Sequence, residues 1–331
     1  TQNGVRGGSA TVHFPIWHQE IEDIIVLKNN KGTEDNRVRK LDYSIQLSKI
    51  FYERFIEDEE ITLFSPHEVP ELYEAWGTPE FDEIYEKTER KTSVKKKKVS
   101  AQTLFFDLLK ERAETGRIYI MNIDHCNTHS SFKDRVTMSN LCQEITLPTD
   151  PIQHIDGKGE IALCILSALN VGKINHLEEL EPLCELAVRS LDEIIDHQLY
   201  PVKAAEISTK ARRSLGIGYI GLAHYIAKNK FKYSDKQAWK LVDELTEAFQ
   251  FYLLKHSSVL AQEKGKNEFF DRTKYSDGIL PIDTYKPEVD EIVKRKLSYD
   301  WEWLRKEIKQ HGLRHSTLSA QMPSESSSVV S

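Results

Sequence analysis

Apolar residues in the first half of the chain occur in short groups that predict strands alternating with helices. The stretch 10-ATVHFPIW-17 predicts a strand, and roughly helical apolar spacing predicts a helix near Tyr43–Ile56. Continuous apolar runs predict buried strands at 117-RIYIMNID-124 and 160-EIALCILSALNV-171. The run 95-KKKK-98 is interpreted as the solvated entry to a second helix, with a phosphate-binding patch as the alternative. That second helix is expected to carry Leu104, Phe105, Leu108 and Leu109.

The second half of the chain has a mostly helical pattern from about residue 177 to 265. One long helix is predicted there from the spacing of Trp239, Val242, Leu245, Phe249, Tyr252 and Leu253. No internal repeat and no low-complexity linker divides the chain. The sequence therefore predicts one α/β unit with a helical portion. The glycine-rich start and serine-rich end suggest that this unit is incomplete at both ends.

Composition narrows the class of protein. The 331 residues include 45 Lys and Arg against 52 Asp and Glu, and the formal charge of −7 argues against a nucleic-acid or membrane-surface binder. No apolar run approaches the roughly 18 residues that cross a bilayer, and the N-terminal residues lack a signal-peptide pattern. We therefore expect an intracellular, cytoplasmic protein.

The four cysteines are too few and too unevenly spaced for a secreted disulfide framework or a zinc ribbon. Cys184 lies on the apolar face of a predicted helix, which favours a core position. Cys126 stands beside His125 and His129, but three potential ligands without a second cluster are a weak metal signal, and no metal site is expected. Cys164 lies in the middle of an apolar run, where a buried structural thiol is favoured.

The stretch 139-SNLCQEITLP-148 sets Asn140, Cys142 and Glu144 at alternate positions. In an extended segment, all three side chains point to the same side. Burying an unpaired carboxylate and amide beside a thiol is costly unless a ligand uses them. The spacing alone leaves both a structural and a functional role open for Cys142.

The segment 216-GIGYIG-221 matches the glycine pattern of dinucleotide-binding loops. That pattern is informative only when it follows a strand and opens a helix. Because the preceding 208-STKARRSL-215 is predicted to be helical, the glycines are interpreted as allowing two helices to approach or turn. An NAD-dependent dehydrogenase remains an alternative function.

Seven segments, in order along essentially the whole chain, carry a resemblance to the large, catalytic subunit of class I ribonucleotide reductase. They are 4-GVRGGSAT-11, 61-ITLFSPHEVPELY-73, 117-RIYIMNIDHCNTHS-130, 140-NLCQEITLP-148, 159-GEIALCILSALNVG-172, 279-ILPIDTY-285 and 311-HGLRHSTLSAQMPSESSS-328. The resemblance implies that residues 1–331 form a single catalytic domain, part of a ten-stranded α/β barrel. It also implies that a finger loop, near residues 138–148, projects into the barrel centre.

The chemistry that the resemblance implies is the reduction of ribonucleoside diphosphates to 2′-deoxyribonucleoside diphosphates, which are DNA precursors. A thiyl radical on Cys142 abstracts the 3′ hydrogen, Glu144 is the general base for the 3′-hydroxyl, and Asn140 holds the hydroxyls. Cys164 is implied to be one of two cysteines that close to a disulfide in each turnover. Its partner is expected N-terminal to Thr1.

The resemblance implies a different role for each end of the chain. From composition alone, 323-PSESSS-328 predicts a capped helix start, a place where backbone N–H groups can bind phosphate. The resemblance assigns the substrate diphosphate to Ser324, Glu325, Ser326 and Ser327. It also places Gln2 and Arg6 in a glycine-rich loop that relays effector identity to substrate choice.

The resemblance implies partners for this chain rather than a bound cofactor. We expect a radical-generating small subunit with a di-metal centre, re-reduction by thioredoxin or glutaredoxin, and a large-subunit dimer. ATP and dNTP effectors are expected on the complete large subunit. The remaining N- and C-terminal parts are expected in the same polypeptide or in separate chains, and turnover by this chain alone is not expected. A non-catalytic fragment remains a second alternative.

Overall fold

A parallel three-stranded sheet and a parallel two-stranded sheet each form the centre of one compact unit in the computed structural model. Unit 1 runs to Ser130 and includes Arg135–Thr146, and unit 2 comprises Ser131–Asp134 and Leu147–Ser331. The structure describes residues 7–152, 154, 158–325 and 329. Each unit is described by itself below.

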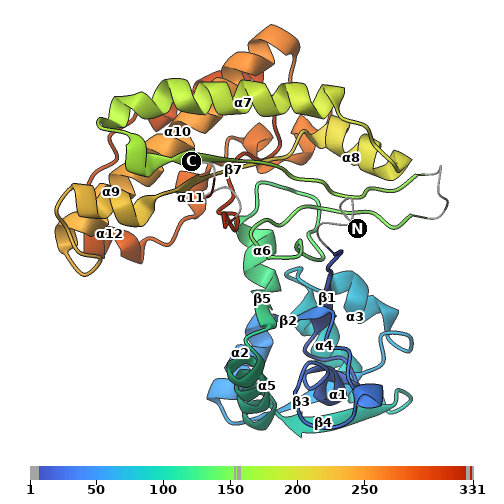
Figure 1. Ribbon diagram of the computed structural model, residues 1–331. Helices are drawn as coiled ribbons and strands as arrows, with labels where there is room; N and C mark the ends of the chain where they lie inside the picture. Colours follow the sequence, from blue (N-terminus) through green and yellow to red (C-terminus); the bar gives the residue numbers. More distant parts are fainter. Residues whose placement is uncertain (1–6, 153, 155–157, 326–328, 330–331) are drawn as a thin grey trace. The chain divides into compact units, whose positions relative to one another are not determined.

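Unit 1 is built on strands in the order β1-β2-β5, all parallel, with helices packed against one face. A separate antiparallel pair is formed by β3 and β4. Helices α2 and α5 lie next to each other (Figure 1). The helices and strands of this unit are β1 (Thr11–Pro15), α1 (Ile21–Ile24), β2 (Asp42–Leu47), α2 (Lys49–Ile56), β3 (Glu60–Phe64), α3 (Pro70–Ala75), α4 (Phe81–Arg90), β4 (Lys96–Ser100), α5 (Ala101–Thr115), β5 (Ile118–Asn122) and α6 (Ile123–His129).

Strand β2 is the central strand of this sheet and is buried on both faces. Tyr43, Ile45 and Leu47 point into the hydrophobic core of unit 1, and Ile45 and Leu47 are 0% exposed. Burying each of these aliphatic side chains contributes about 1.5–3 kcal/mol. On the opposite face, Ser44 and Gln46 are also buried. A polar face that is buried needs hydrogen-bond partners above it.

The sequence located some of these elements and misassigned others. The strands predicted at 10–17 and 117–124 and the helix around Leu104 are confirmed by β1, β5 and α5. The helix predicted for Tyr43–Ile56 is wrong in its first half, because the apolar residues of β2 alternate with polar ones at the period of a strand.

The lysine run is also not a helix entry. Residues 96–98 lie in β4, and the helix begins only after Ser100, whose hydroxyl accepts a hydrogen bond from the Thr103 N–H at 3.2 Å. Two of the lysines form ion pairs with glutamates distant in sequence, Lys97 with Glu22 and Lys98 with Glu60. The pairing with β3 and these ion pairs account for a strand at this position.

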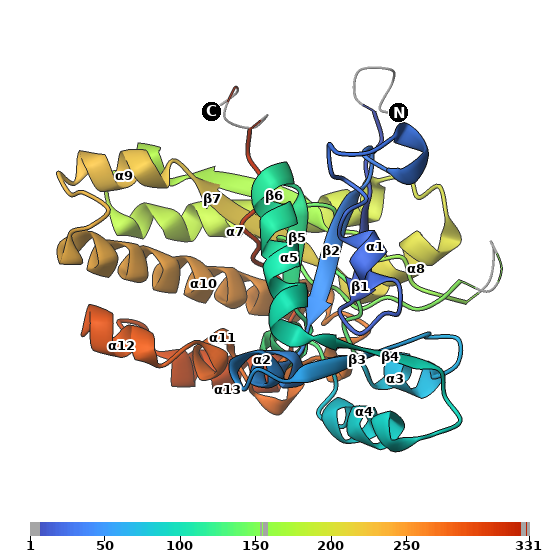
Figure 2. The ribbon, with the colours of Figure 1, turned by 90° about the horizontal axis from the view of Figure 1, so that it is seen from below.

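Unit 2 contains a parallel pair of strands, β6 and β7, covered by long helices. The helices α7 and α10 run side by side (Figures 1 and 2). Their apolar faces and one face of β7 form a single core. The helices and strands of this unit are β6 (Ile165–Asn170), α7 (Leu180–His197), α8 (Lys203–Arg212), β7 (Leu215–Ile220), α9 (Leu222–Lys228), α10 (Lys236–Lys264), α11 (Pro281–Thr284), α12 (Glu288–Val293) and α13 (Trp301–His311).

The predicted long helix is confirmed by α10, and the core position of Cys184 on α7 is confirmed by its 0% exposure. The predicted helical region is interrupted by β7, however. The strand predicted at 160–171 is confirmed only from Ile165 onward, so Cys164 precedes the strand instead of lying in its middle.

The fold is therefore mixed α/β, as predicted. The described residues place their strands in sheets of three, two and two strands. The single-domain organisation and the ten-stranded barrel remain predictions. In the part of the chain that the structure describes, no helix has the length and apolar character needed to span a membrane.

Candidate functional site

The polar face of the β1-β2-β5 sheet brings together side chains from three separate parts of the sequence. His13 on β1 is in register with Ser44 on β2, which is in register with Tyr119 on β5. Asp42 is in register with Thr11 and lies on the same face, two residues before Ser44. Parallel strands in register point matching residues to the same side, so these groups form one polar strip.

The finger loop lies over this strip and uses its polar groups. Gln46 donates from Nε2 to the Thr137 carbonyl at 2.7 Å, and the Thr11 hydroxyl donates to the Leu141 carbonyl at 2.7 Å. The amide of Gln143 donates to the Ser44 hydroxyl. These bonds give Gln46, Ser44 and Thr11 hydrogen-bond partners and fix the loop above the sheet.

The tip of the finger loop is a tight turn. The Gln143 N–H donates to the Asn140 carbonyl at 3.2 Å, Gln143 has a φ of 61°, and Ser139 and Thr146 form an antiparallel bridge behind the turn. The extended geometry assumed for Asn140, Cys142 and Glu144 is therefore wrong. The three residues are brought together by a turn rather than by strand alternation.

Cys142 is half-buried at this turn, and its surroundings favour a protonated thiol. Burial raises the pKa of Cys142, and the negative charges of Glu144 and Asp42 raise it further. The pKa of Tyr119 is raised by burial and by its proximity to Cys142. A thiol held protonated at neutral pH is a poor nucleophile and metal ligand. It remains suited to chemistry that removes a whole hydrogen atom.

Glu144 has a buried carboxylate oxygen, Oε2, with no hydrogen-bond partner among the described residues. Leaving such an acceptor unsatisfied costs about 1–3 kcal/mol or more. Asn140 is engaged instead, because its Oδ1 accepts from the Ile145 N–H at 3.4 Å and from the Ser139 hydroxyl at 3.3 Å. The turn thus carries a protonated thiol and a carboxylate oxygen that has no hydrogen-bond partner among the described residues.

The remaining predicted residues belong to unit 2 or lie outside the described residues. Cys164 immediately precedes β6, and β7 pairs with β6 on one edge and with the segment around Leu318–Ala320 on the other. That segment leads to Ser324, which is half-buried, and Glu325, which is exposed. The other two predicted diphosphate-binding residues, Ser326 and Ser327, and the predicted specificity-loop residues, Gln2 and Arg6, lie outside the described residues.

A buried ion-pair cluster anchors the segment that carries Cys164. Arg212, 2% exposed, donates to both oxygens of Glu160 at 2.6 and 2.9 Å and to Asp134 at 2.9 Å. Glu160 also exchanges two backbone hydrogen bonds with Asp150, at 3.1 and 3.2 Å. The position of residue 160 is thus fixed four residues before Cys164.

A second buried cluster fixes the segment that leads to Ser324. His315 contacts Asp192 through Nε2 at 3.2 Å and Ser257 through Nδ1 at 2.9 Å. Burial alone raises the pKa of Asp192, but His315 and the charges of Arg213 and Arg314 hold it well below its usual range. An ionised carboxylate only accepts, so Nε2 carries the proton and Ser257 donates to Nδ1. All three members of this Ser-His-Asp arrangement are 0% exposed, which makes it structural.

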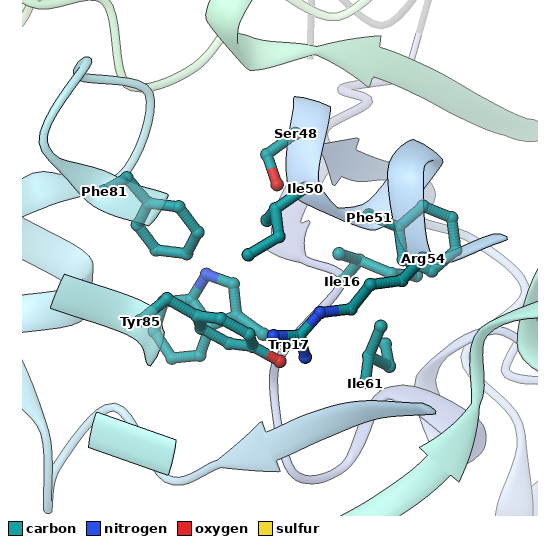
Figure 3. A pocket seen from close by; sticks show the side chains of 9 residues that line it. All are labelled: Ile16, Trp17, Ser48, Ile50, Phe51, Arg54, Ile61, Phe81 and Tyr85. Carbon is teal, nitrogen blue, oxygen red and sulfur yellow. The ribbon is translucent and has the colours of Figure 1, made fainter. Parts of the chain in front are cut away.

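A small cavity in the core of unit 1 is not a substrate site (Figure 3). Its volume is about 10 Å³, room for one water molecule. Trp17 Nε1, buried and without a described partner, belongs to the wall, and the Arg54 guanidinium lies 5.1 Å from the Tyr85 ring centre. The cavity is lined by Ile16, Trp17, Ser48, Ile50, Phe51, Arg54, Ile61, Phe81 and Tyr85.

The described residues contain no group of three His, Cys, Asp or Glu side chains that could hold a metal ion. His125 and His129 pack edge to face on α6, with ring centres 5.4 Å apart. Burial, together with the charge of Asp124, raises the pKa of Cys126 to about 11. This thiol is therefore protonated at neutral pH.

The glycine pattern at 216–221 is not a dinucleotide-binding loop. Gly216 and Gly218 lie inside β7, and only Gly221 lies in the turn before α9. The dinucleotide pattern needs its glycines in the loop itself, where the phosphates approach. The interpretation that these glycines allow two helices to approach or turn is also wrong, because Gly216 and Gly218 lie in a strand. The dehydrogenase alternative is not supported.

Sequence reasoning missed the residues beneath the finger loop: Asp42, Ser44, His13 and Tyr119. Burial lowers the pKa of His13, although a contact with the Ser139 backbone raises it. The signal that could have found them was the polar alternation within each strand. Their juxtaposition, however, depends on the parallel register of β1, β2 and β5, which no local pattern encodes.

Parallel strands are backed by helices, and one turn over a sheet face carries a protonated thiol and a carboxylate oxygen without a partner among the described residues. These features describe an α/β domain with a candidate thiol-based site. The whole sequence, residues 1–331, matches the family model described as "Ribonucleotide reductase, barrel domain". The chain belongs to this family.

Curated relatives carry matching names. The chain is 57% identical to the ribonucleoside-diphosphate reductase subunit alpha of Haemophilus influenzae, with all of this chain and 45% of the relative aligned. It is 53% identical to the ribonucleoside-diphosphate reductase 1 subunit alpha of Escherichia coli and 44% identical to the subunit alpha of Enterobacteria phage T4. Each alignment covers the whole chain and 44% of that relative. The chain thus spans less than half the length of these relatives.

Proposed function

We propose that this chain is the catalytic barrel portion of a ribonucleoside-diphosphate reductase and contributes the radical thiol and one redox thiol. The observation that carries the proposal is the buried oxygen of Glu144, which has no hydrogen-bond partner in the part of the chain that the structure describes and lies on the same turn as the protonated Cys142. A carboxylate left without a partner is costly, and a substrate hydroxyl would satisfy it. Membership of the family and the names of the relatives support the same assignment.

The reaction begins with hydrogen-atom transfer at the finger loop. A Cys142 thiyl radical takes the hydrogen atom from C3′ of the ribose, which re-forms the thiol and leaves a radical at C3′. Glu144 accepts the proton of the 3′-hydroxyl as the 2′-hydroxyl leaves as water. Asn140, held by its contacts with Ile145 and Ser139, orients the ribose hydroxyls.

Two electrons complete the reduction. Cys164 and a second cysteine outside this sequence are oxidised from thiols to a disulfide, and their two protons and two electrons replace the 2′-hydroxyl with hydrogen. Cys142 then returns a hydrogen atom to C3′ and Glu144 returns its proton to O3′, so the thiyl radical and the carboxylate are both regenerated. The balance is one ribonucleoside diphosphate and two thiols giving one deoxyribonucleoside diphosphate, one disulfide and water.

The same proposal includes the rest of the barrel, the effector and substrate-diphosphate contacts, and the partner proteins. The chain contributes to a ten-stranded barrel in a cytoplasmic large-subunit dimer, with effector nucleotides acting through Gln2 and Arg6. The substrate diphosphate binds at Ser324, Glu325 and the two serines that follow. A small subunit with a di-metal centre supplies the oxidising equivalent for Cys142, and thioredoxin or glutaredoxin reduces the disulfide.

The test combines this chain with polypeptides that supply the remaining parts of the large subunit and with the small subunit. Conversion of CDP to dCDP is followed under reductant. Cys142→Ser is expected to abolish conversion, and Glu144→Gln to lower it by about 10²–10⁴-fold, as for loss of a general base. Cys126→Ser, which changes a half-buried thiol outside the site, is the matched control and keeps activity. Conversion that survives Cys142→Ser refutes the proposal, and no conversion by an intact parent complex favours a non-catalytic role.

A further inference from the structure

Strand β7 presents side chains on one face and almost none on the other. Leu215, Ile217 and Tyr219 pack into the core formed with α7 and α10. Gly216 and Gly218 alternate with these residues, so the opposite face of the strand has no side chain at either position. The family assignment leaves these two glycines unexplained.

Gly216 leaves room for the sulfur of Cys164. A Cβ atom built at residue 216 stands 2.5 Å from Cys164 Sγ, 2.6 Å from Leu166 Cδ2 and 3.3 Å from Ala320 Cβ. Non-bonded heavy atoms reach optimal contact at about 3.5–4.0 Å. Alanine at residue 216 is therefore incompatible with the present position of the Cys164 thiol.

Gly218 leaves room for the segment that leads to Ser324. A Cβ atom built there stands 2.4 Å from the Ala320 carbonyl oxygen and 2.7 Å from Gln321 Oε1. Gln321 Oε1 accepts a hydrogen bond from the Tyr219 N–H at 3.0 Å. The obstruction at residue 218 is largely backbone, so it cannot be relieved by a side-chain rotation.

Backbone conformation does not explain these glycines. Among the glycines of 216–221, only Gly221 has a positive φ, at 78°. Gly216 and Gly218 are in ordinary strand geometry, which any residue adopts. Close approach by neighbouring groups is the property that requires glycine at both positions.

We propose that Gly216 and Gly218 are positioning residues of the reductase site. Gly216 sets the location of the Cys164 thiol, and Gly218 sets the path of the segment that leads to Ser324. The inference rests on the proposed function for the role of Cys164 and for the diphosphate-binding role of the residues that begin at Ser324. The contacts themselves are independent of it.

The thiol placement is tested in the 331-residue chain. Iodoacetamide alkylation of Cys164 is followed by peptide mass spectrometry, with Cys126 and Cys142 as internal controls. In Gly216→Ala, a thiol displaced by about 1 Å changes its access, and a rate change of about tenfold is expected at Cys164 alone. Equal rates in parent and variant overturn the placement.

A double-mutant cycle covers the case in which Gly216→Ala fails to fold. Cys164→Ala removes the sulfur that lies 2.5 Å from the added methyl group. Combining it with Gly216→Ala is expected to restore much of the melting temperature that Gly216→Ala loses. Leu166→Ala is combined with Gly216→Ala in parallel, because Leu166 Cδ2 lies 2.6 Å from the same added methyl group and the second cycle measures how much of the loss that contact causes. Strictly additive losses with Cys164→Ala, or a double variant that still fails to fold, overturn the proposal.

The steady-state kinetics of the reconstituted reductase distinguish the role of Gly216 from that of Gly218. Gly216→Ala is expected to lower kcat about 10²-fold with little change in KM for CDP, the cost of misplacing a reacting group. Gly218→Ala is expected to raise KM about tenfold or more, equivalent to losing one charge-assisted hydrogen bond. Identical kinetic changes in both variants contradict the assignment. If Cys164→Ser keeps full activity, the proposed function fails instead, and the alkylation experiment still measures the placement of the thiol.

Discussion

Replacing Arg212 with methionine tests whether the buried ion-pair cluster holds unit 2 together. Methionine keeps most of the aliphatic length of arginine but none of its charge or hydrogen bonds. Arg212 donates two hydrogen bonds to Glu160 and one to Asp134, and its guanidinium lies 5.0 Å from the Phe269 ring centre. After the substitution, Glu160, only 6% exposed, loses its principal partner.

The expected loss of stability follows from that burial. Removing one member of a buried ion pair costs about 3–5 kcal/mol. Arg272 remains 3.6 Å from Glu160 and 2.8 Å from Asp134, so the lower end of the range is expected. A loss of about 3 kcal/mol corresponds to a melting temperature lowered by roughly 6–12 °C in a unit of this size.

Differential scanning calorimetry at neutral pH measures the effect in the 331-residue chain. Lys210→Met is the matched control, because Lys210 pairs with Glu206 at the surface and its loss should leave the melting temperature nearly unchanged. Adding Glu160→Gln to Arg212→Met should recover part of the loss, since the uncompensated charge is removed. An Arg212→Met melting temperature equal to that of the control refutes the reasoning.

Two pH-dependent predictions follow from the buried titratable groups. Burial lowers the pKa of His315 by more than its contact with Asp192 raises it. Below about pH 6.5 the unfolded chain therefore binds more protons at this histidine than the folded chain does, and the free energy of unfolding falls on acidification. The melting temperature of His315→Gln should therefore fall less between about pH 7 and 5.5 than that of the parent, and parallel curves would contradict this. Burial and the charges of Glu144 and Asp42 raise the pKa of Cys142, so Glu144→Gln should shift the midpoint of its alkylation profile to lower pH. An unmoved midpoint would exclude Glu144 as a neighbouring charge.

Much of the site could be predicted from sequence because it depends on contiguous motifs. Asn140, Cys142 and Glu144 were recognised together, and the structure places all three on one turn. The geometry inferred for them was wrong because the left-handed conformation of Gln143 is not signalled by its residue type. Glycine or asparagine is the usual occupant of that conformation.

The errors in the fold have a different origin. The spacing of Tyr43, Ile45 and Leu47 is compatible both with a helix and with the strict alternation of a strand. The segment is a strand because β2 pairs with β1 and β5. The glycines of β7 favour a turn by local propensity, but hydrogen bonds with β6 on one edge and with the segment around Leu318–Ala320 on the other make this segment a strand. Both cases depend on partners distant in sequence, which local patterns do not contain.

The lysines of β4 also bear on how the chain avoids self-association. Within the described part of the chain, β3 is the only strand that borders β4, so one edge of this pair has unpaired backbone groups. Lys96, Lys97 and Lys98 are exposed along it. A second copy adding its own β4 there would set rows of like charge about 5 Å apart, which is unfavourable. Charged side chains on this edge strand therefore disfavour its pairing with the same strand of a second copy.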